Sequence, residues 1–467
     1  MKKINIYLIL CIIFSALIMS CGGTMKSSKK QFAGIDEKLV SRNYSGAIAQ
    51  IESAKGKYYK KKEQALYYLD IGMLYHFNKQ YAKSNEMLSK AEQAIDELYT
   101  KSISKAVVSM LLNDNVMDYS GEDYEDIYLN VFKAMNYLAL DRFDEAFVEI
   151  RRINNKLSLL EQKHKKMADQ YNTSKDKQKE FKTGTNKFHN SALGRYLSML
   201  IYRAEGKIDD ARIDRDKINE AWKLQAQIYD FRKPVFDNYL QSSENVKVDF
   251  LSFIGRAPDK KAKTLYIHTE KNLIIIGTTK ENPRGKQNLE TLDLINWPGV
   301  KKGYHFKFQL PVMKKRKSSI GHVKIIVDGQ AVKTLEMIED IEKVAFETYK
   351  IKEPLIYLKT ITRSVIKGLF STKRKQEMEK KIANPLLGFA ARIATDIAVD
   401  ATENADLRIS RFFPAKALVG EIELTPGVHN IKIEYYSKNG AKLFVDDIGD
   451  KEISKNGLNL VESYYLN

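Results

Sequence analysis

Residues 113–152 of the chain read NDNVMDYSGEDYEDIYLNVFKAMNYLALDRFDEAFVEIRR. Apolar side chains recur at helical spacing over 124–138 and again over 143–157, so the stretch predicts two amphipathic helices. A short connection separates them, and Asp141 within it is expected to cap the second helix. Two helices joined so closely form a hairpin, and we predict a tetratricopeptide-like unit.

The helical pattern extends over residues 35–240. Ala47 and Ala54 recur 37 positions later as Ser84 and Ala91, and small residues at such positions let two helices cross closely. We therefore predict an all-α, tetratricopeptide-like solenoid, an architecture that commonly presents a binding surface. The candidate partner-binding residues are Tyr75, Tyr124, Tyr128, Tyr137 and Tyr202.

The N-terminus has the pattern of a secretory signal. Lys2 and Lys3 precede an apolar run over residues 4–19, which is shorter than the roughly 20 residues of a membrane-spanning helix. A small residue and then Cys21 follow this run, as in the lipobox of bacterial lipoproteins. We predict a signal peptide over 1–20 and lipidation of Cys21, the alternative being an ordinary signal peptide or an uncleaved anchor.

Cysteine content and charge restrict the function further. The chain has two cysteines, Cys11 in the expected signal peptide and Cys21 in the lipidated position. A mature protein without thiols excludes disulfides, cysteine nucleophiles and cysteine metal sites. Residues 21–34 are expected to form a tether, and the expected location is the outer membrane, facing the periplasm. The net charge of +18 is spread along the chain, and a secreted protein does not routinely meet nucleic acid, so we expect no nucleic-acid partner.

From residue 241 to residue 467 the pattern is that of strands. Apolar residues alternate with polar ones after Val246 and again after Tyr304, which is the period of a half-buried strand. Asp328-Gly329 and Asn439-Gly440 follow two such runs and predict hairpin turns. We predict an α+β chain in which this half is an antiparallel sheet or sandwich, with a helical insertion at about 336–403.

Two basic features interrupt the pattern. An insert at about 161–187 is rich in lysine and is either a helix extending from the solenoid or a mobile loop. In the helical insertion, cations repeat every four residues along one face, and they form either a headgroup or glycan site or a solvated face. The candidate basic patch consists of Lys163, Lys165, Lys166, Lys359, Arg363 and Lys367. Separately, Asp406 and Arg408 are either a ligand clamp or a structural ion pair, and we favour the ion pair.

The order of residues in several stretches resembles an uncharacterised family of bacterial envelope lipoproteins with tetratricopeptide-like repeats. The resemblance covers most of the mature chain and implies the lipid anchor and the helical repeats, without an established activity. It is carried by Asn113-Asp114-Asn115, Tyr119-Ser120-Gly121-Glu122, Tyr124-Glu125, Ala134-Met135-Asn136-Tyr137-Leu138, Ala146, Val148-Glu149, Arg151-Arg152, Tyr196-Leu197-Ser198, Ile201-Tyr202, Ala405-Asp406-Leu407-Arg408 and Phe413-Pro414.

The sequence contains no known catalytic signature. Its seven histidines show no metal-ligand spacing, and it has no phosphate-binding glycine loop, nucleophile elbow or dinucleotide fingerprint. We therefore expect no catalytic residue, no metal and no cofactor. The predicted function is that of a lipid-anchored envelope scaffold that binds a protein or peptide partner. The alternative is a module that binds an anionic envelope polymer or lipid through its basic patches, and an envelope hydrolase is a third, less favoured hypothesis.

Overall fold

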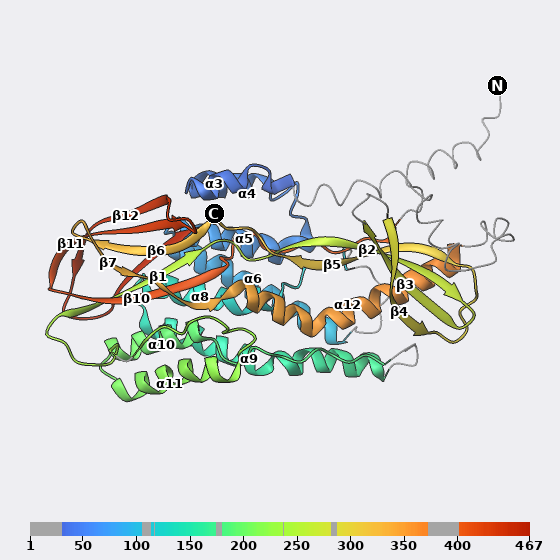
Figure 1. The fold of residues 1–467 in the computed structure, drawn as a ribbon, viewed down its shortest axis with the longest axis horizontal. Helices are drawn as coiled ribbons and strands as arrows, with labels where there is room; N and C mark the ends of the chain where they lie inside the picture. Colours follow the sequence, from blue (N-terminus) through green and yellow to red (C-terminus); the bar gives the residue numbers. More distant parts are fainter. Residues whose placement is uncertain are drawn as a thin grey trace, which may run out of the picture.

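The molecule is elongated, with two packed sheets at one end, a third sheet at the other and the helix α12 (Ile341–Ser371) running along the axis between them (Figure 1). The computed structural model describes residues 30–104, 114–115, 117–173, 180–236, 238–281, 287–371 and 401–467. The signal peptide, Cys21 and the tether as far as residue 29 lie outside the described residues.

Helices fill the N-terminal half, as predicted, and most of them form antiparallel pairs. Those of this half are η1 (Lys30–Phe32), α3 (Ile35–Val40), α4 (Tyr44–Ala54), η2 (Lys61–Glu63), α5 (Gln64–Phe77), α6 (Tyr81–Ser104), α8 (Asp123–Leu138), α9 (Phe143–Asn172), α10 (Ala192–Ala204) and α11 (Ile208–Leu224). The two helices predicted from residues 113–152 are α8 and α9, and α9 extends into the first part of the lysine-rich insert. Residues 174–179 of that insert lie outside the described part.

Four helical hairpins share one turn geometry. In the pairs α3/α4, α5/α6, α8/α9 and α10/α11, the residue with positive φ is Arg42, Lys79, Asp141 and Gly206, respectively. In each turn the N–H of this residue donates to the carbonyl three residues earlier. The N–H of the following residue donates to the carbonyl five residues before that following residue. These two bonds define the Schellman motif. The prediction that Asp141 caps α9 is wrong, because its backbone, with φ 55°, ends the preceding helix instead.

A close contact between α5 and α6 requires glycine at position 72. A Cβ at Gly72 would lie 2.8 Å from Cδ2 and 2.9 Å from Cγ of Leu88. We therefore expect Gly72→Val to lower the free energy of unfolding by about 1–3 kcal/mol through overpacking, as measured by urea denaturation. Gly56→Val is the control, because a Cβ there would meet nothing within 4 Å. Equal losses in the two variants would contradict this account.

The C-terminal half contains three sheets, mostly antiparallel as predicted, with parallel pairing only for β13 beside β1 and β9 beside β5 among the described strands. Sheet A has the order β13 (Asn459–Tyr465), β1 (Val246–Ile254), β10 (Lys416–Leu424), β8 (Glu336–Asp340). Sheet C has the order β12 (Lys442–Ile453), β11 (Gly427–Ser437), β6 (Ile320–Val327), β7 (Gln330–Thr334). Sheet B has the order β4 (Gln287–Asn296), β3 (Leu273–Glu281), β2 (Asp259–Glu270), β5 (His305–Lys314), β9 (Ala401–Glu403). The predicted turns at Asp328-Gly329 and Asn439-Gly440 join β6 to β7 and β11 to β12.

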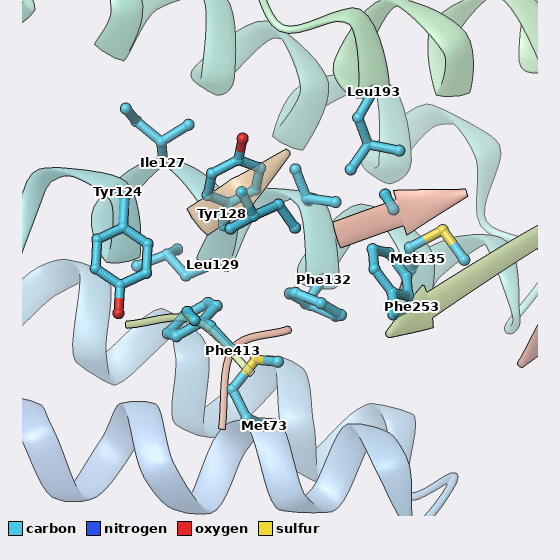
Figure 2. Packing of buried hydrophobic residues seen from close by; sticks show 14 of the residues in the cluster. Met73, Tyr124, Ile127, Tyr128, Leu129, Phe132, Met135, Leu193, Phe253 and Phe413 are labelled. Atoms are coloured by element: carbon cyan, nitrogen blue, oxygen red, sulfur yellow. The ribbon is translucent and has the colours of Figure 1, made fainter. Parts of the chain in front are cut away.

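Sheet A is buried between the helices and sheet C. On β1, Leu251 and Phe253 belong to the core shared with the helices, whereas Val248 and Phe250 belong to the core shared with sheet C. Figure 2 shows Phe132 of α8 beside Phe253, with ring centroids 5.0 Å apart. The helical half and sheet A therefore form one continuous hydrophobic core.

Sheet B packs against α12 (Ile341–Ser371). Ile361 and Val365 of this helix join the apolar face of sheet B. The helical insertion was predicted to begin at about residue 336, but the helix begins five residues later, at Ile341. Residues 336–340 instead form strand β8 at the edge of sheet A. Residues 372–400, the greater part of the remaining insertion, lie outside the described residues. Among the helices that are described, none is both long and apolar enough to cross a membrane.

Candidate functional site

A cavity of about 210 Å³, which we call the junction pocket, lies where the helical half meets α12 and β2. Its walls come from the segment leading into α8, from α9, α12 and β2, and from the loop before Arg408. Five basic and five acidic side chains line it, together with apolar ones. The charged residues are Lys163, Lys260, Lys352, Lys359, Arg408, Asp114, Asp118, Glu122, Asp123 and Asp406.

One wall of the pocket is fixed by Arg408. Its guanidinium forms the expected ion pair with Asp406, with an N–O distance of 2.8 Å, and also donates to the backbone carbonyls of Asp114 at 2.6 Å and Met117 at 3.0 Å. Burial alone would raise the pKa of Asp406, but Arg408 outweighs it and holds that pKa below its usual value. The contacts of Arg408 with protein groups favour the structural interpretation over a ligand clamp.

The N-terminus of α8 carries a second charged cluster. Asp123 accepts from His164 Nε2 at 2.8 Å and from Lys163 Nζ at 3.1 Å. Burial favours a raised pKa for Asp123, but His164 and Lys163 hold it well below its usual range. The other ring nitrogen of His164, Nδ1, is buried and has no hydrogen-bond partner among the described residues. Two side chains of α9 therefore hold Asp123 at the wall of the pocket.

Glu122 is a third acidic residue that lines the junction pocket. Its carboxylate contacts the ammonium groups of Lys260 and Lys352, the latter at 2.7 Å. Glu122 is also the N-cap residue of α8, and its backbone N–H donates to Glu125 at 2.8 Å. Lysines from β2 and α12 therefore both bind the N-cap residue of α8, the first of the two helices predicted from residues 113–152.

The predicted basic patch does not form one free surface. Lys359 pairs with Asp114 at 2.8 Å, and Arg363, with a side chain only 3% exposed, lies 3.9 Å from the same carboxylate. Lys163 lines the junction pocket. Lys165 and Lys166 are exposed on α9, and the side chain of Lys367 lies outside the described residues. Two segments far apart in sequence therefore supply Lys163 and Lys359 to one pocket.

The five candidate tyrosines fall into two groups. Tyr124 and Tyr128 are fully buried, and the Tyr128 hydroxyl donates to Glu339 of β8, so their prediction as partner-binding residues is wrong. Tyr75, Tyr137 and Tyr202 are only partly buried. Each of these three lies four residues before the left-handed residue of its turn, so they occupy equivalent positions in successive hairpins.

Several pocket residues carry little sequence signal. Lys260 lies on β2 without any motif around it, and His164 was only one of seven unclustered histidines. The seven-residue spacing of Lys352 and Lys359 places them on one helix face, which is the one signal that could have linked them. The acidic residues at the start of α8 are explained by the helix dipole alone, so their partners were not predictable.

Neighbouring cations determine the charge of three carboxylates in the pocket. Against the effect of burial, neighbouring cations lower the pKa of Asp114, Asp123 and Asp406, so these carboxylates stay anionic and none is a proton donor near neutral pH. Among the described residues, no group of three or more His, Cys, Asp or Glu is placed to hold a metal ion. A scan of protein-family models and searches of curated proteins and solved structures found no match to this chain.

Proposed function

We propose that this chain is a lipid-anchored scaffold of the cell envelope that binds a protein or peptide partner, and that the junction pocket is its recognition site. The observation that carries the proposal is the convergence of two segments on one cavity, the first represented by Asp114 and residues 117–122 and the second by Asp406 and Arg408. Both segments belong to the stretches that resemble envelope lipoproteins. Their backbones are joined through Arg408, so the pocket is held in a defined shape.

The chemistry of the pocket suits a peptide. Its five basic and five acidic side chains provide both donors and acceptors. Met117, Met167 and Leu355 add an apolar wall, and methionine side chains adapt to varied partners. A peptide segment offers backbone polar groups and apolar side chains together, so it fits this mixture better than a purely anionic polymer does.

The helical frame supports the scaffold part of the proposal. Four hairpins with one turn geometry are consistent with a tetratricopeptide-like repeat. The inner face of α8 packs against this chain's own sheet A, so we do not place the partner there. The three equivalent tyrosines, Tyr75, Tyr137 and Tyr202, instead offer a second contact surface at the ends of the hairpins.

The proposal disfavours polymer binding through the predicted basic patch. Four carboxylates of the pocket, those of Asp114, Glu122, Asp123 and Asp406, are already paired with cations of this chain. Lys163, Lys359 and Arg363 are likewise engaged with Asp123 or Asp114. Attraction to an anionic polymer through these side chains would require breaking ion pairs within the pocket.

Site-specific photo-crosslinking in whole cells tests the pocket. A photoreactive residue in place of Met167, which lines the pocket, is expected to give a discrete adduct with a protein partner, identified by mass spectrometry. The matched control is the same residue in place of Lys165, which is exposed on the same helix and outside the pocket. Identical adducts from the two positions, or none from Met167, would reject the pocket as the recognition site.

A further inference from the structure

A lysine-rich loop joins α4 to η2 at the surface of the helical half. Lys55, Lys57, Lys60 and Lys61 are all exposed. Lys55 and Lys57 lie over the rings of Tyr67 and Tyr58, at 4.8 and 5.3 Å. None of the four lysines is ion-paired with a described carboxylate, in contrast to the lysines of the junction pocket. This loop, residues 55–61, therefore carries four lysines and no acidic residue, and Glu63, which follows it, is the carboxylate that interacts with Lys60.

A buried side chain and backbone hydrogen bonds hold the loop in place. Tyr59, in its middle, is only 6% exposed, and its hydroxyl donates to Asp70 at 2.7 Å. The N–H groups of Lys57 and Tyr58 both bond the carbonyl of Ala54 at the end of α4, at 3.1 and 2.8 Å. The backbone is thus anchored while the lysine side chains face outward, so the positive charge is presented at a fixed place.

The predicted tether ends beside this loop. Gln31 and Phe32 line a small cleft together with Lys57, Tyr58 and Lys60. The Gln31 carbonyl accepts from Gln50 at 2.7 Å. The point at which the tether joins the folded protein is therefore fixed next to residues 55–61.

Geometry places the loop within reach of a membrane. Gln31 lies ten positions after Cys21, and a fully extended chain over ten positions spans at most about 35 Å. The segment between them is itself basic, with lysines at positions 26, 29 and 30. Charges act on a membrane surface over roughly 8 Å at physiological salt, so a short tether can hold the loop within the range in which its charges matter.

We propose that residues 55–61 bind anionic lipid headgroups and orient the folded protein on the membrane that holds its lipid anchor. The inference rests on the lipid anchor of the proposed function but not on the partner. Each lysine close to an anionic surface increases binding about fivefold, and a basic patch beside an acyl anchor is an established way to combine two weak or moderate membrane signals. Orientation by this loop would direct the same face of every molecule toward the lipid.

The test uses the full, lipidated protein in vesicles of neutral phosphatidylcholine or of phosphatidylcholine with a quarter phosphatidylglycerol. A water-soluble amine-reactive reagent labels the lysines, and mass spectrometry gives the rate at each position. In anionic vesicles we expect the labelling of Lys57, Lys60 and Lys61 to slow at least threefold relative to neutral vesicles, and high salt to reverse the effect. Lys165 and Lys166 on α9, which lies across the molecule from α4 (Figure 1), are the exposed controls and should not change.

Equal slowing at the loop and control lysines, or no slowing at the loop, would overturn the inference. A K57E/K61E variant separates charge from burial, because Lys60 should lose its protection in anionic vesicles; retained protection of Lys60 also overturns the inference. The same variant should keep the crosslink from Met167, so loss of protection with an intact crosslink leaves the partner proposal standing. A mature protein without acyl chains on Cys21 would overturn the lipid anchor and this inference together.

Discussion

Replacing Arg408 by alanine is expected to lower the free energy of unfolding by about 3–5 kcal/mol, because it breaks a buried ion pair by removing one partner. The Arg408 side chain is 7% exposed. Its removal leaves Asp406 without the guanidinium that keeps it ionised, and it leaves the carbonyls of Asp114 and Met117 without a donor. Urea denaturation followed by circular dichroism measures the change.

The matched control is Arg142→Ala. Arg142 forms an ion pair with Glu145 on the surface, with its own side chain 53% exposed, and such pairs contribute about 0–1 kcal/mol. We also expect the alanine variant of Arg408 to lose the crosslink from Met167, since the segment before α8 is no longer joined to the loop. If the two arginine variants unfold at the same urea concentration, Arg408 does not hold the junction pocket together.

The parts of the fold that follow from local sequence were predictable. The hairpin of α8 and α9 follows from helical periodicity on either side of a short connection. The turns at Asp328-Gly329 and Asn439-Gly440 follow from residues that tolerate positive φ. Each of these features depends on neighbours within a few positions, so one sequence is sufficient to locate it.

Features that depend on distant contacts were not predictable. Tyr124 and Tyr128 lie on a periodic helix face that is equally suited to a partner and to a core, and only the approach of sheet A decides between the two. Residues 336–340 form a strand because β10 is beside them, although they directly precede a helix. In the same way, β1 is buried on both faces because two layers cover it, whereas its alternation predicts one buried face.

The residues of the junction pocket also divide into those that local sequence singled out and those that depend on distant contacts. Its acidic residues lie in stretches whose order is distinctive, so the sequence singled out the segment around Glu122 and the Asp406–Arg408 pair. The cations that meet them come from α9, α12 and β2, more than 100 residues away in the case of Lys260 and Lys352. Charge patterning along one helix cannot show which carboxylate a lysine faces, so the patch predicted from Lys359 and Arg363 was placed on the surface.

Stability is expected to fall as the pH rises from about 4 to about 7, because carboxyl groups are buried between the helices and the loop that follows Arg408. Burial raises the pKa of Asp70 and of Glu125 to about 7. Asp70 accepts from the hydroxyls of Tyr59 and Ser410, and Glu125 accepts from Tyr119 and from the Ser410 N–H. Glu122 lies beside Glu125 and raises its pKa further, whereas Arg411 near Asp70 lowers that of Asp70.

The sign follows from proton binding. A carboxyl group whose pKa is higher in the folded than in the unfolded state binds more protons when folded, so raising the pH through this range favours unfolding. Shifts of this size correspond to about 3–4 kcal/mol per group. Asp123, Asp114 and Asp406 have lowered pKa values and act in the opposite direction, chiefly below about pH 5, at the acidic end of this window.

Urea denaturation of Asp70→Asn and Glu125→Gln at intervals from pH 4.5 to pH 8 tests this expectation. Each substitution removes one titrating group while keeping a side chain of the same shape, so each variant should lose about 3 kcal/mol less stability across the range than the parent. Asp209→Asn is the control, because that side chain is 90% exposed, and its curve should run parallel to the parent's. If the stability of all three variants changes with pH in parallel with that of the parent, Asp70 and Glu125 stay ionised in the folded protein, held by their hydroxyl and amide donors. The joint between the helices and the loop would then be insensitive to pH.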